Sequence, residues 1–162
     1  MDGPVRKILV YIDGTEGSIT AAQYAICLAK YTKAELHAMY VINIKALNEL
    51  VKARIFLREE EIEYERDLKA DAERYLKHVK ELALRKGVEI KTESTMGSPH
   101  QEIIRKVKEE GIDLLVIGEL SRIRSRRDEF YDETERAMRS VTCSVLIVKD
   151  DERVFQLYDA LQ

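Results

Sequence analysis

Short apolar runs alternate with longer segments of helical spacing along most of this 162-residue chain. Each run is rich in β-branched and aromatic residues and ends at turn-forming residues such as Asp13-Gly14, which is typical of a buried strand. Strands that alternate with helices form a parallel sheet with right-handed crossovers and helices on both faces. The sequence therefore predicts an α/β protein, a three-layer sandwich around a five-stranded parallel sheet. The predicted strands are residues 7–13, 34–43, 88–95, 113–118 and 144–149.

The intervening segments have the features of helices. Residues 58–86 form a long, strongly charged segment with an apolar stripe, and Gly87 ends it. Ser98 and Gln101 have the spacing of a capping box, and Pro99 suits the first helical position, so a helix is predicted to begin there. The predicted helices are residues 15–33, 58–86, 99–110 and about 130–140.

Two segments are less regular. Residues 44–57 are predicted to be a loop with a short helix. Residues 1–150 are predicted to form one domain, and residues 151–162 a C-terminal tail. The tail keeps helical spacing, which fits either a docked helix or a contact with a partner. Its apolar residues are Val154, Leu157, Tyr158 and Leu161.

The composition excludes several classes of protein. A net charge of −3 gives no bulk attraction to nucleic acid or to anionic membranes. No apolar run approaches the roughly 18 residues of a membrane span. Without a secretory signal at the start, the protein is expected to be cytoplasmic, with Cys27 and Cys143 as reduced thiols in the core. A disulfide between these two cysteines is the alternative.

In a parallel sheet of this kind, ligands bind outside the carboxyl ends of the strands. The residues expected there are Asp13-Gly14, Val41–Asn43, Thr95–Gly97 and Gly118–Ser121.

Three separate segments resemble the universal stress protein family. They are KILVYIDGTEGSITAAQYAICLA, MGSPHQEIIRKVKEEGIDLLVIG and ERAMRSVTCSVLIVK, and together they cover about residues 5–150 in the family's order. The resemblance implies a flavodoxin-like (HUP-type) sheet of strand order 3-2-1-4-5. It also implies a homodimer that forms through the last strand and, in many members, ATP binding.

The chain departs from the family's phosphate-binding signature. Nucleotide-binding members carry Gly, two residues, Gly, nine residues, Gly and then Ser or Thr. Gly118 matches the first position, but Ser121, Tyr131 and Asp132 stand at the other three. Glycines there let backbone N–H groups approach phosphates, whereas a tyrosine would fill that space and carboxylates, including Glu133, would repel a polyphosphate. The sequence therefore predicts a stress-response or regulatory protein that has no bound cofactor and acts through protein partners.

An adenine-nucleotide switch is the alternative. Asp13 matches the family's acid near the adenosine, Val41 a hydrophobic residue near the adenine, and Gly97 a glycine after the third strand. Arg122 and Arg124, together with Arg126 and Arg127, could hold the phosphates of ATP or AMP in place of the glycines. These arginines could instead pair with the acids that follow them, which are Asp128, Glu129, Asp132, Glu133 and Glu135.

Other chemistries lack their motifs. A receiver-type phosphoacceptor would need a carboxylate where Gly118 stands, and there is neither a Walker-type phosphate loop nor a G-x-S-x-G elbow. His37, His78 and His100 are far apart in sequence and lack metal-ligand spacing with the cysteines. The sequence therefore favours a binding or regulatory protein over an enzyme, with no catalytic or metal site.

Overall fold

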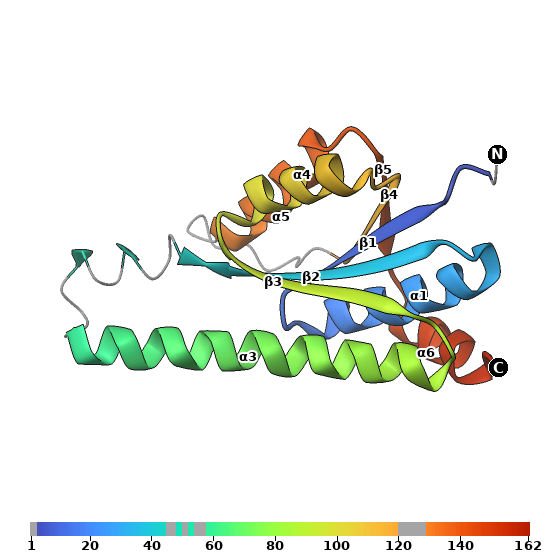
Figure 1. Cartoon of the computed structure of the whole chain (residues 1–162), viewed down its shortest axis with the longest axis horizontal. Coiled ribbons are helices and arrows are strands. Elements are labelled where there is room, and N and C mark those ends of the chain that lie inside the picture. The colour runs from blue at the N-terminus through green and yellow to red at the C-terminus, as the bar shows by residue number, and fades with distance from the viewer. Residues whose placement is uncertain (1–2, 45–47, 50–51, 54–57, 120–128) are drawn as a thin grey trace.

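A computed structural model of the chain shows a five-stranded parallel sheet with helices on both faces (Figure 1). It describes all residues except 1–2, 45–47, 50–51, 54–57 and 120–128. The strand order is β3-β2-β1-β4-β5, so the order expected from the family resemblance is confirmed. The elements are β1 (Lys7–Ile12), α1 (Glu16–Thr32), β2 (Glu35–Asn43), α3 (Arg58–Arg85), β3 (Ile90–Gly97), α4 (Pro99–Glu110), β4 (Leu114–Gly118), α5 (Glu129–Ser140), β5 (Ser144–Val148) and α6 (Asp151–Ala160).

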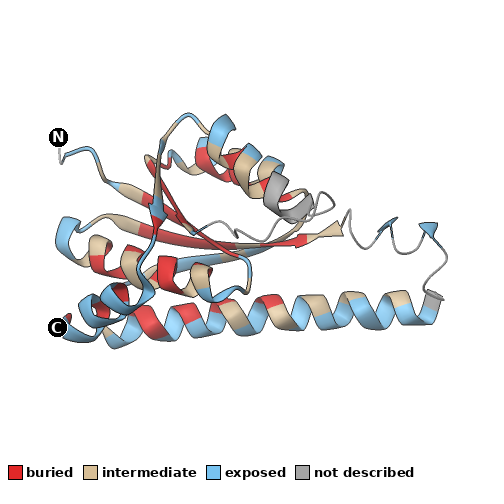
Figure 2. Ribbon diagram, turned by 180° about the vertical axis from the view of Figure 1, so that it is seen from behind, coloured by how far each residue is buried: buried red, intermediate tan, exposed pale blue. Residues whose placement is uncertain are grey.

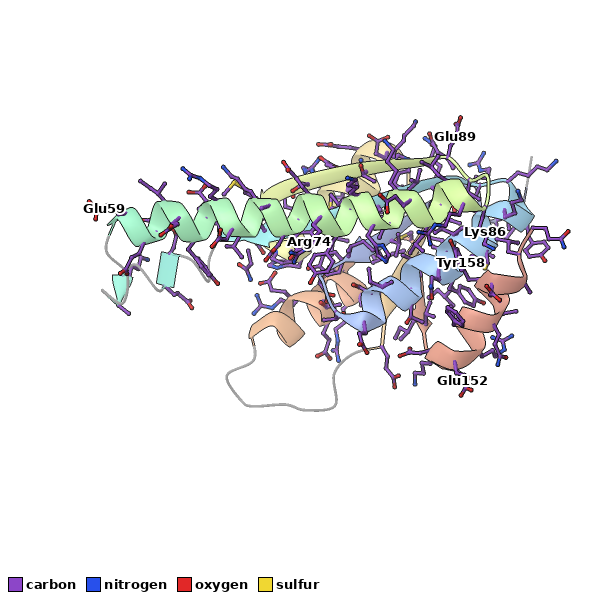
Figure 3. All side chains as sticks on the ribbon, turned by 90° about the horizontal axis from the view of Figure 1, so that it is seen from below. Glu59, Arg74, Lys86, Glu89, Glu152 and Tyr158 are labelled. Carbon is purple, nitrogen blue, oxygen red and sulfur yellow. The ribbon has the colours of Figure 1, made fainter. Side chains whose placement is uncertain are left out.

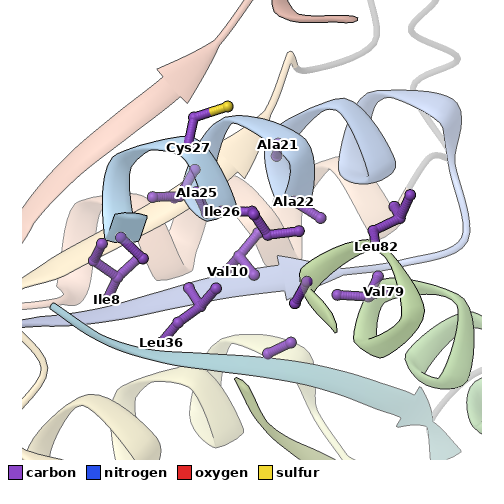
Figure 4. Close-up of a cluster of buried hydrophobic side chains, with 14 of the residues drawn as sticks. Ile8, Val10, Ala21, Ala22, Ala25, Ile26, Cys27, Leu36, Val79 and Leu82 are labelled. Atoms are coloured by element: carbon purple, nitrogen blue, oxygen red, sulfur yellow. The ribbon is translucent and has the colours of Figure 1, made fainter. Parts of the chain in front are cut away.

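The central strand β1 divides the core into two layers. Its register places Val10 between Ala38 of β2 and Val116 of β4. Side chains that alternate along a strand point to opposite faces. Ile8, Val10 and Ile12 therefore pack with α1, α3 and α6, whereas Leu9 and Tyr11 pack on the face covered by α4 and α5. Figure 4 shows Ile8 and Val10 beside side chains of α1 and α3. The apolar runs of β1 and β4 are buried on both faces, as predicted (Figure 2).

The C-terminal segment contains the helix α6, which docks on the rest of the chain. α6 packs on α1, with Val154 and Tyr158 buried. The Tyr158 hydroxyl donates to the Leu82 carbonyl of α3 at 2.7 Å, and Lys86 Nζ donates to the Leu161 carbonyl at 2.9 Å (Figure 3). The end of α3 and the end of the chain are therefore tied together.

Both cysteines are free thiols, with Cys27 buried and Cys143 half-buried. Burial raises the pKa of both thiols, which keeps them protonated near neutral pH. Among the helices that the structure describes, none has the length and apolar character needed to cross a membrane.

Candidate functional site

The turn after β1 is built by the side chain of Asp13. Its Oδ1 accepts hydrogen bonds from the backbone N–H of Thr15 at 3.0 Å and from the Thr15 hydroxyl at 2.6 Å. Thr15 in turn caps α1 by accepting from the N–H of Ser18 at 3.2 Å. Asp13 thus fixes the entry into α1, and its carboxylate remains exposed at the carboxyl end of the sheet.

Gly118 has a packing role. A Cβ atom on this residue would lie 2.4 Å from the carbonyl oxygen of Gly17 and 2.9 Å from the N–H nitrogen of Ser18. The first turn of α1 therefore packs directly against the end of β4, and only glycine leaves enough room. This contact accounts for the first glycine of the family's signature whether or not a phosphate is bound.

Val41 and Gly97 lie near each other at the ends of β2 and β3. Val41 is 5% exposed and pairs with Thr95, whereas Gly97 pairs with Asn43. Gly97 has a φ of 149°, a conformation that residues with a side chain rarely adopt. The two residues therefore have structural roles at the edge of the predicted site.

The rest of the predicted phosphate site is only partly described. Ser121, Arg122 and Arg124 lie outside the described residues. Tyr131 and Asp132 lie in the first turns of α5, and their side chains are not described either.

Among the described residues, Glu133 of α5 accepts hydrogen bonds from the start of α4. Its carboxylate oxygen Oε2 accepts from the Ser98 hydroxyl at 2.9 Å and from the backbone N–H of His100 at 3.0 Å. The same oxygen lies 2.5 Å from Nδ1 of the His100 ring. Glu133 is only 7% exposed, so a buried carboxylate of α5 occupies the N-terminus of α4.

This arrangement corrects one prediction. Ser98 precedes α4 and Pro99 begins it, as predicted, but the Ser98 side chain makes no capping hydrogen bond to the helix. Its hydroxyl instead donates to Glu133, whose carboxylate caps α4 from outside.

The electrostatics agree with an ionised Glu133. Burial alone would raise the pKa of its carboxyl, but the hydrogen bonds from the His100 N–H, the His100 ring and Ser98 outweigh burial and lower the pKa. Tyr11 lies close by, and burial raises the pKa of its phenol with further contributions from the charges of Asp13 and Glu133. The carboxylates of Asp13, which follows β1, and of Glu133, in α5, therefore both raise the pKa of the Tyr11 phenol.

The position of α4 is fixed by charged contacts with β3. Arg105 Nη2 lies 3.1 Å from Glu93 Oε1, and Lys106 Nζ lies 3.0 Å from Glu93 Oε2. Lys106 is 8% exposed. These partly buried pairs hold α4 over the sheet edge and so place Ser98 and His100 where Glu133 can reach them.

The chemistry that this arrangement supports is limited. A helix N-terminus attracts anions through its free N–H groups. At α4 the N–H of His100 is already bound to the carboxylate of Glu133, which leaves a negative charge where an incoming phosphate would also carry one. Within the described part of the chain, no group of three or more His, Cys, Asp or Glu residues could hold a metal ion.

The sheet order and the polar residues at the carboxyl ends of the strands define a flavodoxin-like α/β protein. The chain belongs to the universal stress protein family, because the model of that family matches residues 4–149.

The relatives agree with this assignment. Universal stress protein MJ0531 of Methanocaldococcus jannaschii is 31% identical over 148 residues, which cover 91% of this chain and 84% of that protein. Among solved structures, a universal stress protein in complex with cAMP has a TM-score of 0.63 at 20% identity, covering 89% of this chain and 96% of that one. The universal stress protein of Archaeoglobus fulgidus in complex with dAMP has a TM-score of 0.58 at 13% identity, covering 92% and 100%.

Proposed function

We propose that this universal stress protein is a regulatory protein, not an enzyme, and that it does not hold ATP through the family's glycine loop. The observation that carries the proposal is the Glu133 carboxylate, which is buried and bound to the start of α4. The sequence supports it, because Tyr131 and Asp132 replace the glycine and the hydroxyl residue of the phosphate-binding signature.

The electrostatic cost of a phosphate beside Glu133 is large. Two like charges about 4 Å apart repel by about 4 kcal/mol at an effective dielectric constant of about 20. Micromolar affinity corresponds to about 8 kcal/mol, so one such contact removes roughly half of it. A triphosphate would therefore bind weakly unless Glu133 moved or became protonated.

The proposed mode of action is through protein contacts, in the cytoplasm and as a homodimer. β5 supports the dimer because it lies at the edge of the sheet and, among the described strands, pairs with β4 alone. Ile147 of this strand is 37% exposed. An unpaired strand edge is a template for pairing with another chain, and a second β5 would extend the sheet.

An adenosine monophosphate switch is the second candidate. Asp13 and Val41 remain at the ends of β1 and β2, where the family resemblance places the nucleoside. Two structural neighbours were solved with cAMP and dAMP, which carry one phosphate each. A nucleotide with a single phosphate would bring less charge toward Glu133 than ATP.

The nucleotide content of the purified protein tests both candidates. Protein purified without added nucleotide is denatured with acid, and the extract is separated by anion-exchange chromatography. We expect no stoichiometric ATP. A stoichiometric ATP peak would overturn the first proposal, and a stoichiometric AMP or cAMP peak would establish the second candidate in its place.

A further inference from the structure

A groove opens at the amino ends of β2 and β3, beside the ends of α1 and α3 (Figure 1). Its volume is about 780 Å³, within the range of sites that bind small organic molecules. Leu36, Val88 and Ile90 give it an apolar floor, and Leu84, which is 62% exposed, adds apolar surface beside them. Leu36 lies seven residues before Asn43, so the groove is about 23 Å along β2 from the predicted nucleotide site.

Lysine side chains surround the apolar floor. Lys30, Lys33 and Lys80 line the groove, and none of them has an acid three or four residues away in the sequence. Several basic residues on other helix surfaces do pair with such acids. The described pairs of this kind are Lys69 with Glu65, Arg74 with Asp71, Arg105 with Glu102 and Glu109, Lys106 with Glu110, and Arg139 with Glu135. Lys30 donates instead to the backbone carbonyl of Lys86 at 2.8 Å, and this uncharged acceptor does not neutralise its ammonium group.

Two acids also line the groove, and both act on one further lysine. Glu35 forms ion pairs with Lys91 and, at 3.7 Å, with Lys7. The hydrogen bond from Lys91 to Glu35 is the chief cause of the raised pKa of Lys91, and the charge of Glu89 contributes to it. Among the described residues that line the groove, four lysines outnumber two glutamates, which gives a net charge of +2. This positive charge stands out in a protein whose net charge is −3.

Lys33 has a backbone conformation that favours glycine. It follows the last residue of α1 with a φ of 59°, in the left-handed region. Glycine is the usual residue at such a helix end, and a side chain there strains the backbone. Strained residues that a fold retains cluster at binding sites, and here the strain places an ammonium group beside an apolar floor. The helix dipole does not account for Lys80, because Lys80 precedes the last turn of α3.

We propose that this groove binds a small organic anion with an apolar body, such as a carboxylate of medium chain length. The apolar part lies on Leu36, Val88 and Ile90, and the carboxylate accepts hydrogen bonds from Lys33 and Lys80. A neutral apolar molecule would leave the ammonium groups without an anion, and an anion without an apolar body would leave the floor in water. Both parts of the ligand are therefore required, and neither involves the nucleotide site.

Octanoate is a suitable probe, with acetate and 1-octanol as controls that each keep one of its two parts. The isotope-labelled protein is titrated with each compound and followed by the NMR signals of its backbone amides. We expect octanoate to bind with a dissociation constant below about 1 mM and to shift the signals of Leu36, Val88 and Ile90. Acetate and octanol should each bind at least about fivefold more weakly. The proposal is overturned if octanoate does not bind, if its shifts lie elsewhere, or if either control binds as tightly.

Paired lysine variants test the positive charge. Lys33→Gln with Lys80→Gln removes two ammonium groups from the groove and should weaken octanoate binding by about fivefold or more. Lys77→Gln with Lys108→Gln is the matched control, because both lysines are exposed, neither lines the groove, and Lys77 lies on the same helix as Lys80. The control should bind octanoate as the natural protein does. An equal loss in both pairs would show an effect of net charge alone and would contradict the proposed site.

Lys33→Gly separates the two roles of this position. Glycine relieves the strain at the end of α1, so the variant should unfold at a higher temperature than the natural protein. It also removes an ammonium group from the groove, so it should bind octanoate more weakly. A variant that is stabilised but binds octanoate as tightly as the natural protein would contradict the role of Lys33 in the site.

Discussion

Replacing Glu133 by alanine should destabilise the protein strongly. The carboxylate is 7% exposed and accepts from Ser98 and from the N–H of His100, with the His100 ring 2.5 Å away. A hydrogen bond to a charged group contributes about 1.5–3 kcal/mol, and loss of a helix cap costs about 0.5–2 kcal/mol. Because the bonds share one oxygen and are not additive, we expect Glu133→Ala to lower the free energy of unfolding by about 3 kcal/mol.

Glu133→Gln provides a conservative comparison, because its amide oxygen can still accept these hydrogen bonds without a charge. We expect it to lower the free energy of unfolding by about half as much. Urea unfolding followed by circular dichroism at neutral pH gives both values. A loss of less than about 0.5 kcal/mol for Glu133→Ala would show that the contact does not stabilise the fold.

The contribution of Glu133 should also depend on pH. Its carboxyl has a lower pKa in the folded protein than in the unfolded chain, so the folded state binds its proton less readily. The stabilisation is therefore complete above the unfolded pKa of about 4.3 and is lost as the pH falls through the lower folded value. The difference in stability between the natural protein and Glu133→Gln should shrink below about pH 4. A difference that grew toward acid pH would contradict this sign.

Three further predictions concern other parts of the fold. Gly118→Ala should lower the free energy of unfolding by about 3 kcal/mol or prevent folding, because its Cβ would collide with the first turn of α1. Thermal unfolding followed by circular dichroism measures this loss, and unchanged stability would contradict the prediction. Tyr158→Phe should cost about 1 kcal/mol in the same assay, because it leaves the buried carbonyl of Leu82 without its donor, and a stabilised variant would contradict that contact. Glu35 should titrate at a pKa of about 2 in an NMR experiment, chiefly because Lys91 donates a hydrogen bond to it. Lys91→Ala should return that pKa toward 4.5, and an unchanged value would show that the ion pair is not formed in solution.

The fold could be predicted because its signals are local. The apolar runs of β1 and β4 are too short for buried helices and end at turn residues, and the structure places both strands within one residue of the predicted bounds. The C-terminal segment shows the limit of periodicity. Its spacing predicted a helix, but the choice between docking and a free partner surface depended on α1, which lies more than a hundred residues away in the sequence.

The candidate site could be predicted only in part. Asp13 and Gly118 were located from their positions after strands, and the structure explains both by contacts with or within the start of α1. The bond between Ser98 and Glu133 could not be found in this way, because the two residues are 35 positions apart, with Ser98 just before α4 and Glu133 in α5. The nearby Gln101 suggested a local capping box, and tertiary structure supplied a carboxylate instead.

The measurement that tests the central claim most directly is isothermal titration of the nucleotide-free protein with ATP and Mg²⁺. The replaced glycine signature and the buried charge of Glu133 predict no binding or a dissociation constant in the millimolar range. Glu133→Gln, tested in parallel where it remains folded, should bind ATP more tightly than the natural protein. Micromolar binding of ATP by the natural protein, unchanged in Glu133→Gln, would contradict the account.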